Sequence, residues 1–250
     1  MPVIFLLSLA LQIACAVHVV RSGRPLYWIW LLLIGSYLAV IVYVVVAVIP
    51  DLRHDPRGRK AASKLVQTID PQRRRRELQR KLELANTVEN RRRLAEESLQ
   101  LGDFQNAQEL YRSLLAGMYA TEPDFMLGLA QAQAGNGDFA DARQTLEQLI
   151  QANPNYKSSD GHLLYARCLE QLGDKEKALQ EYRVLADSYP GEEGRYRYAS
   201  LLKDTQRHAE AREVLQNQLN RAKLMPRYYR QKEQGWLKAA KLALAELGDA

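Results

Sequence analysis

The chain begins with two long apolar runs and continues as a mixed sequence whose apolar positions recur at helical spacing. Residues 3–20 and residues 26–49 carry no Lys, Arg, Asp or Glu, and the second run starts with Tyr27, Trp28 and Trp30. A helix needs about 20 apolar residues to cross a bilayer, and aromatic rings favour the membrane interface. We therefore predict two transmembrane helices, joined as an antiparallel hairpin by the short polar turn between them.

The first run is short enough to leave other interpretations open. A cleaved signal peptide needs positive charge ahead of its apolar region, and no Lys or Arg precedes Arg21. The tripeptide Ile13-Ala14-Cys15 is similar to the end of a lipoprotein-processing box, but Gln12 stands where that box has an apolar residue. The run could span the membrane, lie in its interface or be processed, and the hairpin is the interpretation favoured here.

Positive charge is concentrated directly after the second run. Residues 51–93 hold 14 Lys and Arg against 6 Asp and Glu, whereas residues 94–250 hold 19 against 23. Five basic residues follow the second run within about 15 positions, and only Arg21 and Arg24 lie in the turn between the runs. This bias predicts that the C-terminal region is cytoplasmic, although the turn is itself basic.

Residues 51–87 are predicted to be a basic juxtamembrane connector that is partly helical. Pro56 and Gly58 favour an irregular start, and Leu78, Leu82 and Ala85 recur at helical spacing, so we expect a helix from residue 71 to 85. The basic side chains could form a solvated face, contact anionic lipid headgroups or, less favoured, bind nucleic acid. The candidates for lipid contact are Arg57, Arg59, Lys60, Arg73, Arg74, Arg75 and Arg76.

A repeated pattern fills the rest of the chain. Four segments, residues 88–121, 123–156, 159–191 and 192–221, each contain a small residue in a first apolar stretch, a turn, and a second small residue. The turns at Gly102, Gly137, Gly173 and Gln206 are separated by 35, 36 and 33 residues. This period predicts pairs of helices that stack into a solenoid. The fourth turn lacks glycine, so we expect it to be less regular.

The small residues are expected where the two helices of a unit approach most closely. A larger side chain there would force the helices apart at a cost of about 1–3 kcal/mol. These positions are Ala95, Ala130, Ala166 and Ala199 in the first helices and Ala107, Ala142, Ala178 and Ala211 in the second helices. Residues 222–250 are expected to end in one long capping helix over the last exposed apolar surface.

These repeats resemble the tetratricopeptide repeat (TPR) family over roughly residues 88–221. The residues that match include Leu94-Ala95, Gly102-Asp103-Phe104, Gly137-Asp138-Phe139 and Gly173-Asp174. Residues 1–55 are similar to the N-terminal membrane region of the cardiolipin synthase family, through the stretch from His18 to Trp30. That family's His-x-Lys-x4-Asp motif is absent here, so the resemblance implies a shared anchor and no shared chemistry. Together the resemblances imply an all-α, bacterial-type protein of the inner membrane.

The resemblance to TPR proteins also implies a peptide-binding groove lined by the first helices, although a solvated surface is an equal alternative. The arrangement of Lys, Asn and Arg that holds C-terminal carboxylates in some members is absent. The residues of this predicted groove are Arg92, Glu96, Leu99, Leu127, Gln131, Leu163, Arg167, Glu170, Tyr196, Ser200 and Lys203.

Neither catalytic nor metal-binding patterns occur in the sequence. There is no Gly-rich phosphate loop, no His-Glu-x-x-His and no Gly-x-Ser-x-Gly. His162 and Cys168 would lie on different faces of one helix, which favours structural roles. We expect no cofactor and no enzymatic activity. The leading hypothesis is a membrane-anchored scaffold that recruits protein partners. An accessory subunit of a membrane-lipid or envelope enzyme is the alternative, and self-association stays open.

Overall fold

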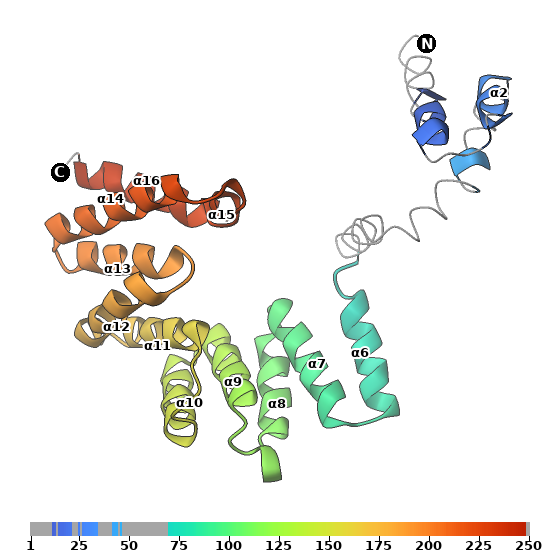
Figure 1. Ribbon diagram of the computed structural model, residues 1–250. Coiled ribbons are helices and arrows are strands. Elements are labelled where there is room, and N and C mark those ends of the chain that lie inside the picture. Colours follow the sequence, from blue (N-terminus) through green and yellow to red (C-terminus); the bar gives the residue numbers. More distant parts are fainter. Residues whose placement is uncertain are drawn as a thin grey trace. The chain divides into compact units, whose positions relative to one another are not determined.

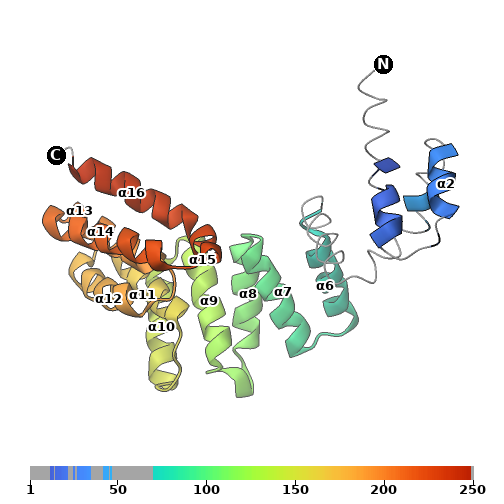
Figure 2. The same ribbon diagram turned by 45° about the horizontal axis from the view of Figure 1, so that its top comes forward.

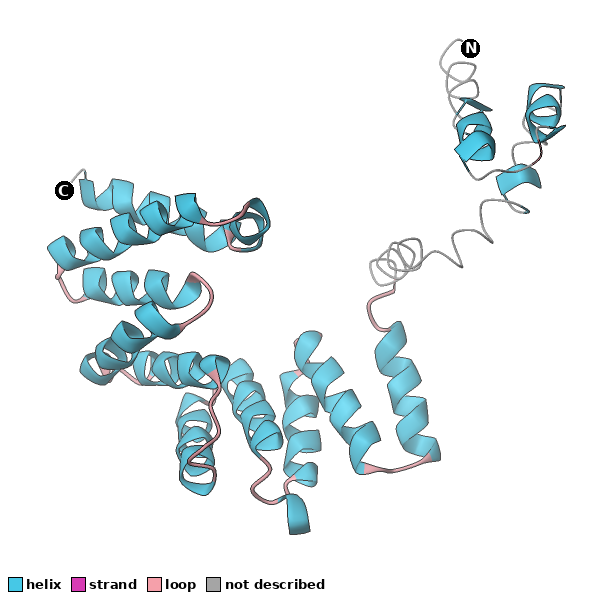
Figure 3. Cartoon of the chain, viewed as in Figure 1, coloured by secondary structure: helices cyan, strands magenta, loops and turns pink. Residues whose placement is uncertain are grey.

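The computed structural model of the protein describes residues 12–13, 15–21, 25, 27–34, 42–44, 46 and 70–248. All regular secondary structure within these residues is helical, as the cartoon shows (Figure 3). The chain divides into two compact units, Met1–Arg73 and Arg74–Ala250.

The first unit brings the two apolar runs of the sequence into contact. Residues 15–21 are helical, and helix α2 spans Tyr27–Ile34. Cys15 and Val19 of the first run pack with Leu32 and Tyr43 of the second run. His18 Nδ1 lies 2.9 Å from Tyr43 Oη. The described parts of the two runs are therefore in contact.

Only about half of the predicted membrane spans, residues 3–20 and 26–49, lies within the described residues, and residues 51–69 of the predicted connector lie outside them. In the part of the chain that the structure describes, no helix combines the length and the apolar character that crossing a membrane requires.

The second unit is a row of helices stacked in sequence order (Figure 1). Four consecutive pairs are followed by two C-terminal helices. The first three pairs fall within the predicted repeats, and the fourth extends beyond residue 221, where the fourth repeat was predicted to end. The pairs are α7 (Val88–Gln100) with α8 (Phe104–Leu114), α9 (Pro123–Asn136) with α10 (Phe139–Ala152), α11 (Ser159–Gln171) with α12 (Lys175–Ser188), and α13 (Glu193–Asp204) with α14 (His208–Leu224).

The predicted small positions lie in the core of this stack. All eight alanines that were expected between paired helices are buried, and none is more than 1% exposed. Each helix pair also contacts the next pair in the chain, for example α8 with α9 and α12 with α13. The apolar core therefore runs along the stack and is shared by neighbouring repeats, which is the arrangement of a solenoid.

The turns between paired helices have one geometry in all four repeats. Gly102, Gly137 and Gly173 take positive φ values of 76°, 90° and 82°, and Gln206 takes a φ of 64° at the fourth turn. The backbone N–H of Arg207 donates to Leu202 O at 2.8 Å, as Asp138 N donates to Gln133 O at 2.9 Å. The expectation of a less regular fourth turn was wrong, because a non-glycine residue adopts the same left-handed conformation there.

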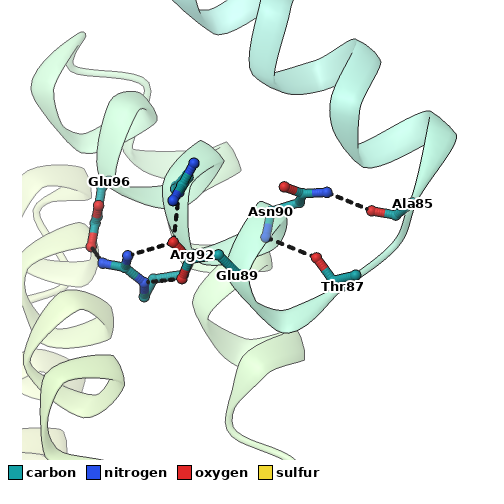
Figure 4. Close-up of polar contacts among 7 residues, drawn as sticks. Ala85, Thr87, Glu89, Asn90, Arg92 and Glu96 are labelled. Carbon is teal, nitrogen blue, oxygen red and sulfur yellow. Dashed lines mark hydrogen bonds and ion pairs between the residues drawn. The ribbon is translucent and has the colours of Figure 1, made fainter.

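A short helix, α6 (Arg73–Leu84), precedes the repeats. It lies within the helix predicted for residues 71–85, and it buries Leu78. The side chain of Asn90 in α7 donates to Ala85 O at 2.8 Å, and Thr87 caps α7 by accepting from Asn90 N (Figure 4). The connection between α6 and α7 is therefore held by specific side-chain bonds.

The C-terminal region contains two helices where one was predicted. Helix α15 spans Arg227–Lys232, and α16 spans Gln234–Gly248 (Figure 2). The break occurs at Glu233, which is only 7% exposed and accepts a hydrogen bond from Glu192 N at 3.0 Å. This long-range contact is invisible in the helical periodicity of the sequence. Helix α16 packs on α13 and α14 and contributes Ala240 and Leu247 to the core.

Candidate protein-binding surface

The residues of the predicted groove lie on the four first helices, α7, α9, α11 and α13, but they differ in how much surface they offer. Leu163 belongs to the core and is 5% exposed, so it presents little surface to a partner. Leu99 and Leu127 are half-buried and pack against core clusters. The side chains of Gln131 and Arg167 are half-buried and make no hydrogen bond or ion pair to another described residue. Their polar groups are therefore not engaged within the part of the chain that the structure describes.

Two residues of the predicted groove in the fourth repeat, Tyr196 and Lys203, contact α16, the last helix of the protein. The Tyr196 ring lies 5.5 Å from the Trp236 ring of α16, measured between centroids. Lys203 Nζ lies 2.5 Å from Glu246 Oε2. The Arg197 guanidinium sits 5.6 Å from the centroid of the Trp236 ring, a cation–π distance. A partner at this end would have to compete with α16.

An ion-pair network occupies the first repeat. Arg92 pairs with Glu89 at 2.8 Å and with Glu96 one turn further on (Figure 4). Arg93 pairs with the same Glu89 at 2.6 Å. The hydrogen bonds from Arg92 and Arg93 lower the pKa of Glu89 to about 2. Two of the predicted groove residues, Arg92 and Glu96, are therefore already paired with each other.

The third and fourth repeats hold the remaining groove residues. Glu170 accepts a hydrogen bond from Tyr182 Oη at 2.6 Å, and burial together with this bond raises the pKa of Tyr182. Ser200 is half-buried on α13.

The arginine run has a structural role that the sequence did not indicate. Arg74 Nε lies 3.0 Å from Glu97 Oε2, and Arg75 lies 2.6 Å from Asp103 Oδ2. Glu97 is 4% exposed, so its charge needs a nearby cation. Two of the residues predicted to contact lipid headgroups therefore also pair with the first repeat. Arg57, Arg59 and Lys60 lie outside the described residues, and Arg73 and Arg76 are exposed on α6.

A cavity of about 430 Å³ opens between α10, α11 and α12. Its lining is apolar at Leu146, Leu149, Ile150 and Leu185 and polar at Lys157, His162, Glu181, Ser158, Ser159 and Ser188. His162 Nε2 lies 2.6 Å from Glu181 Oε2. This cavity was not predicted from the sequence, and none of its lining residues belongs to the predicted groove.

Among the described residues, no group of three or more His, Cys, Asp or Glu side chains is placed to hold a metal ion. Cys168 is fully buried in the core cluster around α10 and α11. Burial raises the pKa of the Cys168 thiol to about 11, so the reactive thiolate is disfavoured. The burial of Cys168 and the raised pKa of its thiol agree with the structural role expected for it.

The fold and the repeated turns define an α-solenoid of paired helices. Comparison with known families gives its type: residues 92–156 and 127–193 match the tetratricopeptide repeat model. The chain therefore contains tetratricopeptide repeats over these residues.

Similar proteins agree with this fold. A thermophilic TPR protein from Thermus thermophilus superposes with a TM-score of 0.52 at 21% identity, covering 72% of this chain and 95% of that one. BtubC from P. vanneervenii gives a TM-score of 0.50 at 17% identity, covering 73% and 89%. The alginate biosynthesis protein AlgK of Azotobacter vinelandii is 38% identical over 106 residues, which are 41% of this chain. This chain spans only about a fifth, 22%, of that relative.

Proposed function

We propose that this protein is a membrane-anchored TPR scaffold that recruits protein partners to the cytoplasmic face of the membrane. The observation that carries the proposal is the joining of two different units in one chain. One has apolar side chains on its outside, and the other is a stack of repeats with polar, half-buried residues along its first helices. Stacked repeats of this type create extended surfaces for binding proteins.

The first unit supports the anchoring. Its exposed side chains are large and apolar, and those between 40% and 70% exposed are Ile13, Val17, Val20, Tyr27, Trp30, Leu31, Val42 and Val46. Soluble proteins seldom expose so many large apolar groups close together, and membrane contact is one reason for such a surface. The polar contact between His18 and Tyr43 is made between the two runs. Apolar side chains outside and polar groups between helices are what a lipid environment favours.

Membrane extraction of the full-length chain tests the anchoring. We expect the protein to stay in the membrane fraction after washing with alkaline carbonate and to be released only by detergent. Replacing Val17 and Trp30 with arginine should move it to the soluble fraction, because each charge in the hydrocarbon core costs about 3 kcal/mol. Arginine at the exposed solenoid positions Val184 and Leu242 is the matched control. Release of the unaltered chain by carbonate would reject the anchor.

Thiol labelling tests the cytoplasmic orientation. Cys15 and Cys168 are buried, so a cysteine placed at Met118, which is 88% exposed, gives a nearly unique reporter. We expect a membrane-impermeant maleimide to label Met118→Cys only after the cells are opened. Labelling in intact cells would place the repeats on the opposite side of the membrane.

Crosslinking in membranes tests recruitment. We expect Gln131→Glu with Arg167→Glu to lose a crosslinked protein that the unaltered chain captures, because both side chains are half-buried and lack intramolecular partners among the described residues. The matched control is Arg183→Glu with Gln216→Glu, which changes exposed positions on second helices. Equal capture by the unaltered chain and both variants would move binding away from the predicted groove.

An accessory subunit of a membrane-lipid or envelope enzyme is the second candidate. It is supported by the similarity to a protein named for alginate biosynthesis, and by the resemblance of residues 1–55 to the cardiolipin synthase N-terminal region. Copurification of an enzyme that survives the Gln131 and Arg167 changes but is lost with Val17→Arg and Trp30→Arg would favour this candidate. Direct binding of anionic lipid or nucleic acid by the arginine run has less support, because Arg74 and Arg75 are engaged within the protein.

A further inference from the structure

The cavity between α10, α11 and α12 exists because the third repeat lacks two side chains that the second repeat has. The turns at Gly137 and Gly173 place the two repeats in register, with a spacing of 36 residues. In this register Phe125 corresponds to Gly161, and Met126 corresponds to His162. A large apolar pair in α9 is thus replaced in α11 by a residue without a side chain and by a polar ring.

In the second repeat, this position is filled by an aromatic ring. Phe125 is 6% exposed and packs with Tyr111 and Leu114 of the preceding helix, α8. Its ring centroid lies 5.9 Å from that of Tyr119. Leu149 of α10 corresponds to Leu114 and lines the cavity in the third repeat. The third repeat therefore retains the apolar residues that pack against the Phe125 ring in the second repeat, but it has no ring at that position.

From this comparison we infer that the cavity beside Gly161 binds an aromatic side chain of a protein partner. The volume of 430 Å³ lies within the range of about 300–1,000 Å³ typical of ligand pockets. It also exceeds the roughly 150 Å³ of an apolar cavity that can hold benzene. Ile150, which is 59% exposed at the cavity, loses its contact with water when a ring covers it. This inference rests on the proposed scaffold function and gives it a specific site.

The polar side of the cavity sets the chemistry of the partner. His162 and Glu181 are bound to each other at 2.6 Å, so the charge of Glu181 already has a partner. A cationic side chain entering the cavity would lose water against the apolar wall, and an anionic one would find only Lys157, an exposed side chain at the edge of the lining whose charge is screened by water. An uncharged aromatic ring has no such cost, and the exposed hydroxyl of Ser159 can bond the backbone that carries it.

Binding of a small probe to the full-length chain in detergent tests the site. The probe is N-acetyl-L-phenylalaninamide, with N-acetyl-L-alaninamide as the ringless control, and the readout is the NMR shift of an isotope-labelled methyl at Ile150. We expect saturable shifts with a Kd on the order of 1 mM for the first compound only. Absence of binding, or equal binding of both compounds, would overturn the inference.

Two variants that restore the side chains of the second repeat identify the cavity as the site. Gly161→Phe should fill it and weaken probe binding at least about tenfold, with Gly235→Phe, a helical glycine in open space, as the control that retains binding. A Cβ at Gly161 would meet Leu127 and Ser158 at 3.3 Å, so a small adjustment is needed. His162→Met provides a second variant with the same expectation, and His208→Met is its control. Undiminished binding by His162→Met in a folded chain would overturn the inference.

The probe experiment separates this inference from the scaffold proposal. Probe binding requires neither a membrane nor a natural partner, so it can fail while membrane recruitment of proteins persists. In that case partners bind elsewhere on the repeats and the cavity assignment is wrong. Probe binding that disappears in Gly161→Phe supports the cavity even if extraction shows that the chain is not anchored.

Discussion

Tyr156 donates a hydrogen bond from its phenolic oxygen to Asp124 Oδ1 at 3.0 Å, which ties the end of the second repeat to its own beginning. Tyr189 makes the same bond to Asp160 at 3.0 Å in the third repeat. Tyr229, in helix α15, donates to Glu192 at the start of the fourth repeat at 2.8 Å. A tyrosine–carboxylate bond therefore holds the start of each of these three repeats, although the first two tyrosines lie in loops and the third lies in a helix.

Removing one of these hydroxyls should destabilise the solenoid. We expect Tyr156→Phe and Tyr189→Phe each to lower the free energy of unfolding by about 1 kcal/mol, since each removes a single hydrogen bond. Urea unfolding followed by circular dichroism measures the change. Tyr228→Phe is the control, because Tyr228 is 73% exposed and should change stability by less than about 0.5 kcal/mol. Equal effects of all three changes would show that the bonds are not stabilising.

Stability should also decrease at alkaline pH. Burial raises the pKa of Tyr111 to about 12, and burial with the bond to Asp160 raises the pKa of Tyr189 to about 12, from an ordinary value of 10.0. A group with a raised folded pKa contributes its full stability below the unfolded pKa and loses it as pH rises toward the folded pKa. The free energy of unfolding should therefore fall between pH 10 and 12.

The slope of that decrease is the quantity to measure. Each buried tyrosine that stays neutral in the folded state contributes at most about 1.4 kcal/mol per pH unit. Tyr182 is fully buried and its pKa is raised by burial and by Glu170, so Tyr182→Phe should make the decrease shallower by up to that amount. Tyr228→Phe is again the control. A stability that does not change between pH 9 and 12 would contradict the expectation.

The sequence predicted the repeats well because their features are local. Helix pairing depends on the buried alanines and on the turn glycines, and both recur at a fixed period. Features that depend on distant residues were missed. The break at Glu233 is set by Glu192, which lies 41 residues away. The pairing of Arg74 with Glu97 requires α6 to lie against the first repeat. Periodicity alone contains neither relationship.

The candidate site also combines features that the local sequence predicts with features that depend on distant residues. Gly161 occupies the position in the third repeat that Phe125 occupies in the second, so the sequence alone contains the basis for predicting the cavity. The contact of Tyr196 with Trp236 could not, because it depends on how α16 packs against α13. The contacts of surface residues are poorly predicted from the register of the repeats alone, because the residues that they contact belong to other helices.

The fourth turn offers a direct test of backbone strain. Gln206 holds a left-handed conformation with a φ of 64°, which is unfavourable for a residue with a Cβ. We expect Gln206→Gly to raise the free energy of unfolding by about 1 kcal/mol. Gln216→Gly, at an exposed position within α14, is the matched control and should lower it by about 1 kcal/mol. Loss of stability in Gln206→Gly would show that its side chain contributes more than the strain it causes.

The attachment of α6 to the first repeat should depend on salt. Two ion pairs, Arg74 with Glu97 and Arg75 with Asp103, join the helix to the repeat alongside the buried Leu78. Because Arg74 is 61% exposed, 1 M salt should screen its ion pair substantially. We expect the α6 amides to exchange with solvent about fivefold faster in 1 M than in 0.1 M NaCl, which is a loss of about 1 kcal/mol.

Charge removal at the same positions separates these ion pairs from a general effect of salt. Arg74→Gln with Arg75→Gln should give fast α6 exchange at both salt concentrations, because Glu97 is left without its cation. Arg80→Gln is the matched control: it removes one of the positive charges of α6 at an exposed position, and its exchange should retain the salt dependence of the unaltered chain. If the double variant exchanges as slowly as the unaltered chain in 0.1 M NaCl, Leu78 and the uncharged contacts hold α6, and the arginine run is again available for lipid headgroups.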